Sequence, residues 1–347
     1  MILAAGLSPA WQQIVVIDAL ALGEVNRARE VHWCASGKVL NVGRALHCLA
    51  GRGVGAARQD CKLKIENCKS QNDQTIGART LAMVGGLTGE AIRREFAEFD
   101  IAARWIETKS PTRVCTTLLV AETGATTELV ENAQPVTASE LALFQTTYHE
   151  EASTAEVVVL TGSLPAGTPA KLYRDLITAT PGRVVLDVQG EPLLAALEAR
   201  PFVVKPNRDE LGNTLGRPLE TDDELHAAMR ELCQRGATWV VVSQGKERVW
   251  IASEREILSA KPPPVAVINP IGCGDCLAAG IAACLASGAD VPDAVLTGMA
   301  AAADNAGQLL PARLDVQRVE AFRGRIILHT VSNGAFHTNP KRQRGSD

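Results

Sequence analysis

The sequence predicts an α/β fold with a mostly parallel central sheet and helices on both of its faces. From residue 157 onward, short runs of β-branched and other apolar residues alternate with segments of helical spacing. Repeated strand–loop–helix units of this kind place helices on both faces of a parallel sheet. A hydrophobic content of 46% is ample for the large core that such a fold needs.

Length, charge and cysteine usage narrow the class of protein. At 347 residues the chain is long for one domain, but α/β folds of this size are often one body with an appendage. The net charge of −4 gives no reason to expect nucleic acid or an anionic membrane as partner. No apolar run reaches the ~20 residues that span a bilayer. Nine scattered cysteines fit reduced thiols, so we expect a cytoplasmic protein that binds small molecules.

The first part of the chain predicts a mixture of strands and helices. Apolar residues at helical spacing, such as Val39, Val42 and Leu46, predict a helix, and Gly124 predicts the turn of a hairpin. The strands are expected at 1–5, 11–17, 28–35, 79–84, 103–107, 113–121 and 126–131, and the helices at 39–49 and 88–99.

The second part alternates regularly between strands and helices. The strands are expected at 157–160, 184–188, 202–205 and 239–243, each with a helix after it or before the next strand, and a hairpin pairs 248–252 with 256–260. In sheets of this kind the ligand lies beyond the carboxyl ends of the strands. The loops that follow these strands are therefore the candidate binding loops.

Two segments do not fit this pattern. Residues 52–77 are mostly polar and contain a seven-residue near-repeat that begins at Cys61 and again at Cys68. We expect an inserted low-complexity surface loop, with a short docked helix as the alternative. The basic tail at 339–347 has no apolar content, and we expect its end to be disordered.

The stretch NPIGCGDC at 269–276 carries the strongest indication of chemistry. It follows a β-branched run at 265–268 and precedes small apolar residues, which predicts a strand end, a glycine turn and a helix start. Amide N–H groups and the helix dipole favour an anion at such a turn, and Asp275 could remove a proton beside it. That combination is what phosphoryl transfer to an alcohol needs.

Other interpretations of these motifs remain open. Asp275 could be an ordinary helix cap, and Cys273 with Cys276 forms a CxxC pair that could be redox-active or half a zinc site. Ser36, Gly37 and Lys38 form a second potential anion site, or simply the start of a well-capped core helix. The chain contains no Walker A pattern, and no GxGxxG follows its first strand, which disfavours P-loop and dinucleotide-binding classes.

Six segments in order carry a family resemblance: GEVNRA at 23–28, SGKVLNVGR at 36–44, TR at 112–113, GSLP at 162–165, KPNRDE at 205–210 and GCGD at 272–275. Together they resemble the ribokinase-like (PfkB) carbohydrate kinases, and most of all the branch of 1-phosphofructokinases and tagatose-6-phosphate kinases. The resemblance implies a three-layer α/β/α sandwich with a small β-sheet lid. It implies one kinase domain at 1–320, with lid strands at about 11–35 and 103–131 and the inserted loop at about 52–77, followed by a tail at 321–347.

The resemblance also implies roles for individual residues. Asp275 would be the base, and the amides of Gly272, Cys273, Gly274 and Asp275 would hold the transferring phosphoryl group. Asn41 would bind a sugar hydroxyl, while Lys38, Arg113 and Ser163 would bind the phosphate already on the substrate. The substrate-binding residues that it implies are Gln12, Gly37, Lys38, Asn41, Arg113 and Ser163.

The implied cofactors are ATP and Mg²⁺. Asn207 and Glu210 would organise Mg²⁺ through its water ligands, which suits a hard ion that retains waters. The nucleotide-binding residues that the resemblance implies are Lys205, Asn207, Glu210, Ser243, Gly245 and Asn305. Lid closure would exclude water from the reaction, and a homodimer through the lid is one expectation because lids of this family often pair.

Three positions depart from the pattern of the branch. Gln12 stands where an aspartate usually binds sugar hydroxyls, Val39 stands where a glycine is usual, and Pro270 replaces a threonine. These changes affect mainly the sugar side. The first hypothesis is therefore a kinase that converts fructose 1-phosphate to fructose 1,6-bisphosphate, with tagatose 6-phosphate or fructose 6-phosphate as alternative substrates. A non-catalytic sugar-phosphate-binding regulatory protein is the alternative from another class.

Overall fold

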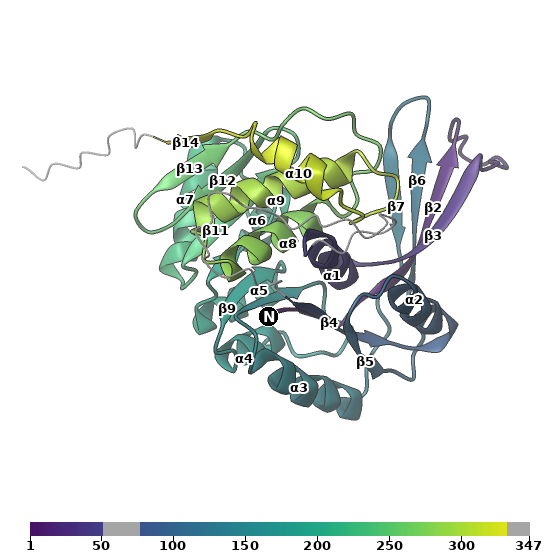
Figure 1. Ribbon diagram of the computed structural model, residues 1–347, viewed down its shortest axis with the longest axis horizontal. Coiled ribbons are helices and arrows are strands. Elements are labelled where there is room, and N and C mark those ends of the chain that lie inside the picture. Colours follow the sequence, from purple (N-terminus) through teal and green to yellow (C-terminus); the bar gives the residue numbers. More distant parts are fainter. Residues whose placement is uncertain (51–76, 332–347) are drawn as a thin grey trace, which may run out of the picture.

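The computed structural model describes residues 1–50 and 77–331. Its main sheet has ten strands in the order β14-β13-β12-β11-β10-β9-β8-β1-β4-β5 (Figure 1). The strands from β5 to β11 pair in parallel, and β12, β13 and β14 extend the sheet in antiparallel fashion. Their bounds are β1 Ile2–Gly6, β4 Ala78–Val84, β5 Ala103–Glu107, β8 Val157–Thr161, β9 Arg183–Asp187, β10 Val203–Val204, β11 Trp239–Gln244, β12 Arg248–Ala252, β13 Ile257–Ala260 and β14 Leu328–Thr330.

Helices cover both faces of this sheet, which confirms the predicted three-layer α/β/α sandwich. One layer holds α1 Lys38–Leu49, α2 Gly86–Glu98, α8 Cys273–Ala286, α9 Val291–Ala306 and α10 Val316–Arg323. The other layer holds α3 Ala138–Ala152, α4 Leu172–Thr178, α5 Glu191–Ala196, α6 Arg208–Leu215 and α7 Asp222–Gln234. Along β1, Ala4 packs with the first layer while Leu3 and Ala5 pack with the second, since successive side chains of a strand point to opposite faces.

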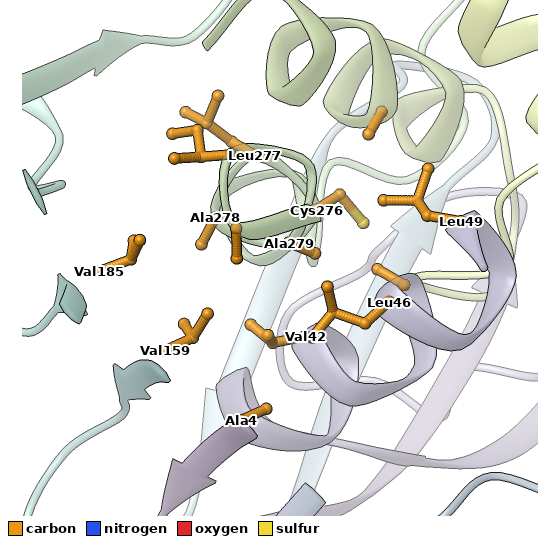
Figure 2. Packing of buried hydrophobic residues seen from close by; sticks show 14 of the residues in the cluster. Ala4, Val42, Leu46, Leu49, Val159, Val185, Cys276, Leu277, Ala278 and Ala279 are labelled. Atoms are coloured by element: carbon orange, nitrogen blue, oxygen red, sulfur yellow. The ribbon is translucent and has the colours of Figure 1, made fainter. Parts of the chain in front are cut away.

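Close packing holds α8 in place at the centre of the first layer. Figure 2 shows Cys276 and Ala279 of α8 beside Val42 and Leu46 of α1, with Val159 of the sheet nearby. On its other side α8 meets α9 without intervening side chains, because a Cβ atom at position 280 would lie 2.5 Å from the Cα atom of the glycine at 298. This packing fixes the N-terminus of α8, which carries the glycine turn.

A second, four-stranded sheet projects to one side of the body (Figure 1). Its order is β3-β2-β6-β7, with bounds β2 Ala10–Ile17, β3 Glu30–Ser36, β6 Val114–Val120 and β7 Thr126–Val130. The strand at 103–107 was expected in this lid, but β5 instead pairs in parallel with β4 at the edge of the main sheet. Its Ile106 is buried in the second core layer, so burial decides its place.

The structure differs from the sequence-based expectations in several other places. Residues 265–268 form no strand, and the amides of Ile268 and Asn269 donate to the carbonyl of Ala306 instead. The expected domain end at 320 falls within α10, and β14 continues the sheet beyond it. Most of the expected loop at 52–77 and the end of the tail lie outside the described residues. Among the described residues, no helix is long and apolar enough to cross a membrane.

Candidate active site

A large cleft of about 1610 Å³ opens at the carboxyl ends of the parallel strands. It extends from Gln12 and Cys115 in the lid, past the N-termini of α1 and α8, to the loop after β11. The predicted site residues that line it are Gln12, Gly37, Lys38, Asn41, Arg113, Lys205, Asn207, Glu210, Ser243, Gly245, Gly272, Cys273, Gly274 and Asp275. The fold therefore brings together residues that are up to 263 positions apart in the sequence, from Gln12 to Asp275.

Asp275 lies in the first turn of α8 and is 6% exposed. Its side chain does not cap the helix; instead Asn41 Nδ2 donates to its Oδ2 at 2.7 Å. Burial, followed by repulsion from the carboxylate of Asp187, raises the pKa of Asp275 to about 6 against the opposing effect of Lys38. A carboxylate with a pKa near neutrality is suited to accept a proton at physiological pH.

The glycine turn before Asp275 presents backbone amides to the cleft. Gly272 has a φ of 86°, and a Cβ atom there would lie 3.0 Å from the Cβ atom of Pro311. In the described part of the chain, the N–H groups of Gly274 and Asp275 have no hydrogen-bond acceptor. Because both amides lie at the positive end of α8, this turn could bind an anion.

Two predicted site residues do not line the cleft. Asn305 is fully buried behind the turn, where its Nδ2 donates to the carbonyl of Ile271 at 2.9 Å and its Oδ1 accepts from the amide of Ala312 at 2.6 Å. Its side chain thus supports the turn from the protein side, and a contact with the nucleotide stays a prediction. Ser163 is exposed at the end of β8, and its carbonyl accepts from Ser8 Oγ at 2.7 Å.

Sequence reasoning missed a buried aspartate at the centre of the site. Asp187 ends β9 and is 1% exposed, and its Oδ1 lies 3.2 Å from Lys38 Nζ and 3.3 Å from Lys205 Nζ. Burial alone would raise its pKa, but the two ammonium groups outweigh burial and lower it. The available indication was an acidic residue at the carboxyl end of a buried parallel strand, where ligands bind.

Asn207 and Glu210 form a capping box at the start of α6. Asn207 Oδ1 accepts from the amide of Glu210, and Glu210 Oε2 accepts from the amide of Asn207, both at 2.8 Å. Glu210 Oε1 lies 3.6 Å from Lys38 Nζ. Because Oε2 is used in the capping box, Oε1 is the oxygen of Glu210 that could face a metal. The described residues contain no group of three His, Cys, Asp or Glu side chains that could hold one. Such sparse ligation fits Mg²⁺ that keeps its waters, and does not fit a fully coordinated metal.

The residues on the lid side are more constrained than the sequence suggested. Gln12 is buried, and its Nε2 donates to Thr117 Oγ1 at 2.7 Å. Arg113 donates to the backbone carbonyls of Ser8, Pro9 and Glu131 at 3.1, 3.3 and 3.0 Å, so it joins the lid to the body.

Two neighbouring residues explain the path of the chain into α1. Gly37 has a φ of 84°, and a Cβ atom there would lie 2.9 Å from the amide nitrogen of Ala10, so no larger residue fits. Val39 was expected beside the sugar site, but it is 1% exposed and packs in the core against β1. Its side chain is directed away from the cleft because it lies one position past Lys38 on the helix, so this departure from the family pattern adds no side chain to the cleft.

The environment of the CxxC pair disfavours redox chemistry. Cys273 Sγ donates to the carbonyl of Ala302 at 3.4 Å, and Cys276 is fully buried in the core. Burial raises the pKa of the Cys273 thiol to about 11 and raises that of Cys276 well above its ordinary value. Reactive cysteines need the opposite shift, because the thiolate is the nucleophile.

The far end of the cleft includes residues that sequence analysis did not identify. Arg325, Ile327 and His329, within and just before β14, line this end together with apolar residues of α9 such as Met299. These residues were assigned to a tail because the strand that carries them is only three residues long.

The family to which this fold and site correspond is defined by comparison with known proteins. The model of the pfkB family of carbohydrate kinases matches residues 63–310, and the chain belongs to this family. The protein is therefore a sugar kinase that transfers a phosphoryl group to an alcohol, and membership of the family implies the use of ATP.

Individual relatives agree with this assignment. The chain is 28% identical to the 1-phosphofructokinase of Bacillus subtilis (strain 168) over 286 residues, which cover 82% of this chain and 85% of that protein. Its fold is similar to that of a possible 1-phosphofructokinase from Thermotoga maritima, with a TM-score of 0.81 at 18% identity over 95% of this chain and 99% of the other. It is also similar to the tetrameric inhibited form of phosphofructokinase-2 from Escherichia coli, with a TM-score of 0.78 at 24% identity over 93% and 98%.

Proposed function

We propose that this kinase phosphorylates a sugar phosphate with ATP and Mg²⁺, and that its reaction converts fructose 1-phosphate to fructose 1,6-bisphosphate. The observation that carries the proposal is the position of Asp275. A buried carboxylate with a pKa of about 6 stands directly beside amides that lack acceptors in the described part of the chain. This places a proton acceptor and an anion site within one helical turn, as transfer to an alcohol requires.

In the proposed mechanism, the acceptor hydroxyl of the sugar approaches Asp275 from the lid side of the cleft. Asp275 takes the hydroxyl proton as the oxygen attacks the γ-phosphorus atom of ATP, and ADP leaves with the electrons of the broken P–O bond. The amides of Gly274 and Asp275 stabilise the charge on the transferring group. Asn41 orients the carboxylate of Asp275 through the 2.7 Å hydrogen bond.

Two lysines, Lys38 and Lys205, pair with the carboxylate of Asp187 close to Asp275. Lys38 Nζ lies between Asp187 and Glu210, at 3.2 and 3.6 Å from their oxygen atoms. In this position it serves the transferring phosphoryl group at least as well as the phosphate already on the sugar. Bound Mg²⁺ supplies positive charge to the nucleotide phosphates, and the Asn207–Glu210 capping box would hold it through water.

Two observations support fructose 1-phosphate as the proposed sugar: the similarity to the 1-phosphofructokinase of Bacillus subtilis and the cations of the cleft. Lys38 and Arg113 favour an acceptor that carries a phosphate. A panel of fructose 1-phosphate, fructose 6-phosphate, tagatose 6-phosphate and free fructose, with release of ADP as the readout, tests the assignment. Turnover highest with fructose 1-phosphate supports it, turnover highest with another sugar replaces it, and binding without turnover of any sugar indicates a regulatory protein.

We also propose that the lids of two copies pair. Val31, Trp33 and Leu129 expose 46%, 44% and 57% of their surface on the lid, and Trp33 stacks on Trp11 with ring centroids 6.2 Å apart. Large exposed apolar side chains gathered on a small sheet are typical of an interaction surface. Light scattering at several protein concentrations measures the oligomeric state.

A further inference from the structure

A cluster of charged and aromatic side chains behind the site plays no part in the mechanism above. Glu95 of α2 is buried between two guanidinium groups, with its Oε1 at 2.8 Å from Arg44 Nη2 and 3.2 Å from Arg313 Nη2. Arg44 lies over the ring of Phe96 at 5.7 Å, and Arg313 over that of Phe99 at 4.9 Å. Burying paired charges costs desolvation free energy. We therefore asked which part of the site this cluster contacts.

One chain of contacts, formed mainly by hydrogen bonds, connects the cluster to Asp275, the proposed catalytic base. Glu95 Oε2 accepts a hydrogen bond of 2.5 Å from the amide of Ala35, at the point where lid strand β3 enters the body. The next residue, Ser36, donates from its Oγ to Asn41 Oδ1 at 3.2 Å. Asn41 in turn donates to Asp275. The carboxylate of Glu95 therefore holds the end of β3. This strand end in turn positions Asn41, which orients Asp275.

A second chain of contacts connects the cluster to the glycine turn at 271–274. Arg313, held by Glu95, directly follows Ala312, whose amide donates to Asn305 Oδ1 at 2.6 Å. Asn305 in turn donates to the carbonyl of Ile271 in the turn. Both chains of contacts start at the carboxylate of Glu95; one ends at Asp275 in the first turn of α8 and the other at Ile271, just before the helix. Neither Glu95 nor Arg313 lines the cleft.

We propose that Glu95 and Arg313 are positioning residues that hold the root of the lid, the catalytic base and the anion-binding turn in one arrangement. Rigid side-chain networks with defined alternative arrangements can transmit such coupling between sites. The effect on turnover rests on the proposed kinase function, whereas the effect on the order of the turn does not.

The test removes the cation and keeps the apolar stem over Phe99, with Arg313→Met. Arg323→Met is the matched control, because Arg323 of α10 is similarly half-buried and pairs at 3.0 Å with Asp293 of α9. Neither residue belongs to the two chains of contacts described above. Arg313→Lys restores the cation. Hydrogen exchange of the backbone amides is measured on each full-length protein without substrate, together with ADP release at saturating ATP and sugar phosphate.

The expected result is that Arg313→Met speeds amide exchange at both 35–38 and 271–276 and lowers kcat by about 2- to 30-fold, the range typical of changes within such networks. The control changes neither quantity by more than about twofold, and Arg313→Lys recovers most of both. Exchange that changes only next to residue 313, or a kcat equal to that of the control, overturns the proposal. If the unaltered protein turns over no sugar phosphate, the proposed function fails, but the exchange data still decide whether the network positions the turn.

Discussion

Replacement of Asp275 by Asn removes the proton acceptor and keeps its shape. The amide oxygen of the variant can still accept the hydrogen bond from Asn41, so the local geometry is preserved. A positioned base contributes about 10²- to 10⁴-fold to turnover, and kcat should fall by that factor. In the unaltered enzyme kcat should fall as the pH drops through about 6, because protonation of Asp275 removes the same function.

The same substitution should make the protein more stable at neutral pH. The pKa of Asp275 is about 6 in the fold against an ordinary value of 3.8, and at ~1.36 kcal/mol per pH unit this difference corresponds to about 3 kcal/mol. Since the folded pKa is the higher one, the fold is destabilised by the ionised group above pH 6, and this penalty is absent below pH 3.8. The gain in the free energy of unfolding for Asp275→Asn should therefore be largest above pH 7 and shrink toward pH 4.

Urea unfolding at a series of pH values, combined with ADP release at saturating substrates, measures both effects. Asp304→Asn is the control, because Asp304 is an equally buried acid on the neighbouring helix α9 that is paired with Arg318 at 2.7 Å and does not line the cleft. Burial also raises the pKa of Asp304, so Asp304→Asn should shift stability in the same direction at neutral pH, while kcat per folded molecule stays within about twofold. Unchanged kcat in Asp275→Asn, or a loss of stability at neutral pH, refutes the role of Asp275 as a buried base.

Four further changes test other parts of the structure. Gly272→Ala forces a Cβ atom to 3.0 Å from Pro311 at positive φ, and kcat should fall at least about tenfold in the ADP-release assay. Asp187→Asn releases Lys38 and Lys205 from their shared carboxylate, so the KM for ATP should change more than that for the sugar phosphate. Gly280→Val should lower the melting temperature in calorimetry, because α8 and α9 can no longer touch. Trp33→Glu should shift light scattering to the monomer if the lids pair.

Much of the fold could be predicted because its strands have strong local patterns. The parallel strands are continuous β-branched runs bounded by turn residues, as at 157–161 and 239–244, and their ends fell within about two residues of the observed ones. The failures have a different origin. The run at 265–268 is β-branched like a strand, but its approach contains three consecutive prolines at 262–264, which have no N–H group to donate to a ladder.

Sequence analysis did not predict the helix α9, whose two faces differ little in hydrophobicity. In α9 the buried surface contains many small residues, such as Gly298 and Ala301, beside larger ones such as Leu296, and small residues give weak hydrophobic periodicity. Such small residues are used because α8 must approach closely, and that requirement arises from tertiary packing. The strand β5 was placed in the lid for a related reason, since nothing local distinguishes an edge strand of the main sheet from one of the lid.

The site was predicted where backbone geometry determines it, and less well where side chains converge from distant segments. The glycine turn and the capping box at 207–210 can be recognised from neighbouring residues, because each motif is local. The pairing of Asp187 with Lys38 joins residues 149 positions apart, and no local pattern predicts it. Val39 points into the core because Gly37 determines where α1 begins. Gly37 packs against Ala10 at the start of β2, a contact that the sequence alone does not show.

Of the three departures from the family pattern, Gln12 and Pro270 line the cleft, whereas Val39 is buried in the core. At Pro270 the threonine side chain of the branch is lost, yet the turn is closed by its own backbone and by Asn269, whose Oδ1 accepts from the amide of Ile271 at 3.0 Å. At Gln12 a neutral amide stands where the resemblance implies a charged residue, and its Nε2 donates to Thr117 Oγ1. If the amides of the α8 turn hold the transferring group, as proposed, substitutions in the lid can change the choice of sugar without loss of the phosphoryl-transfer chemistry.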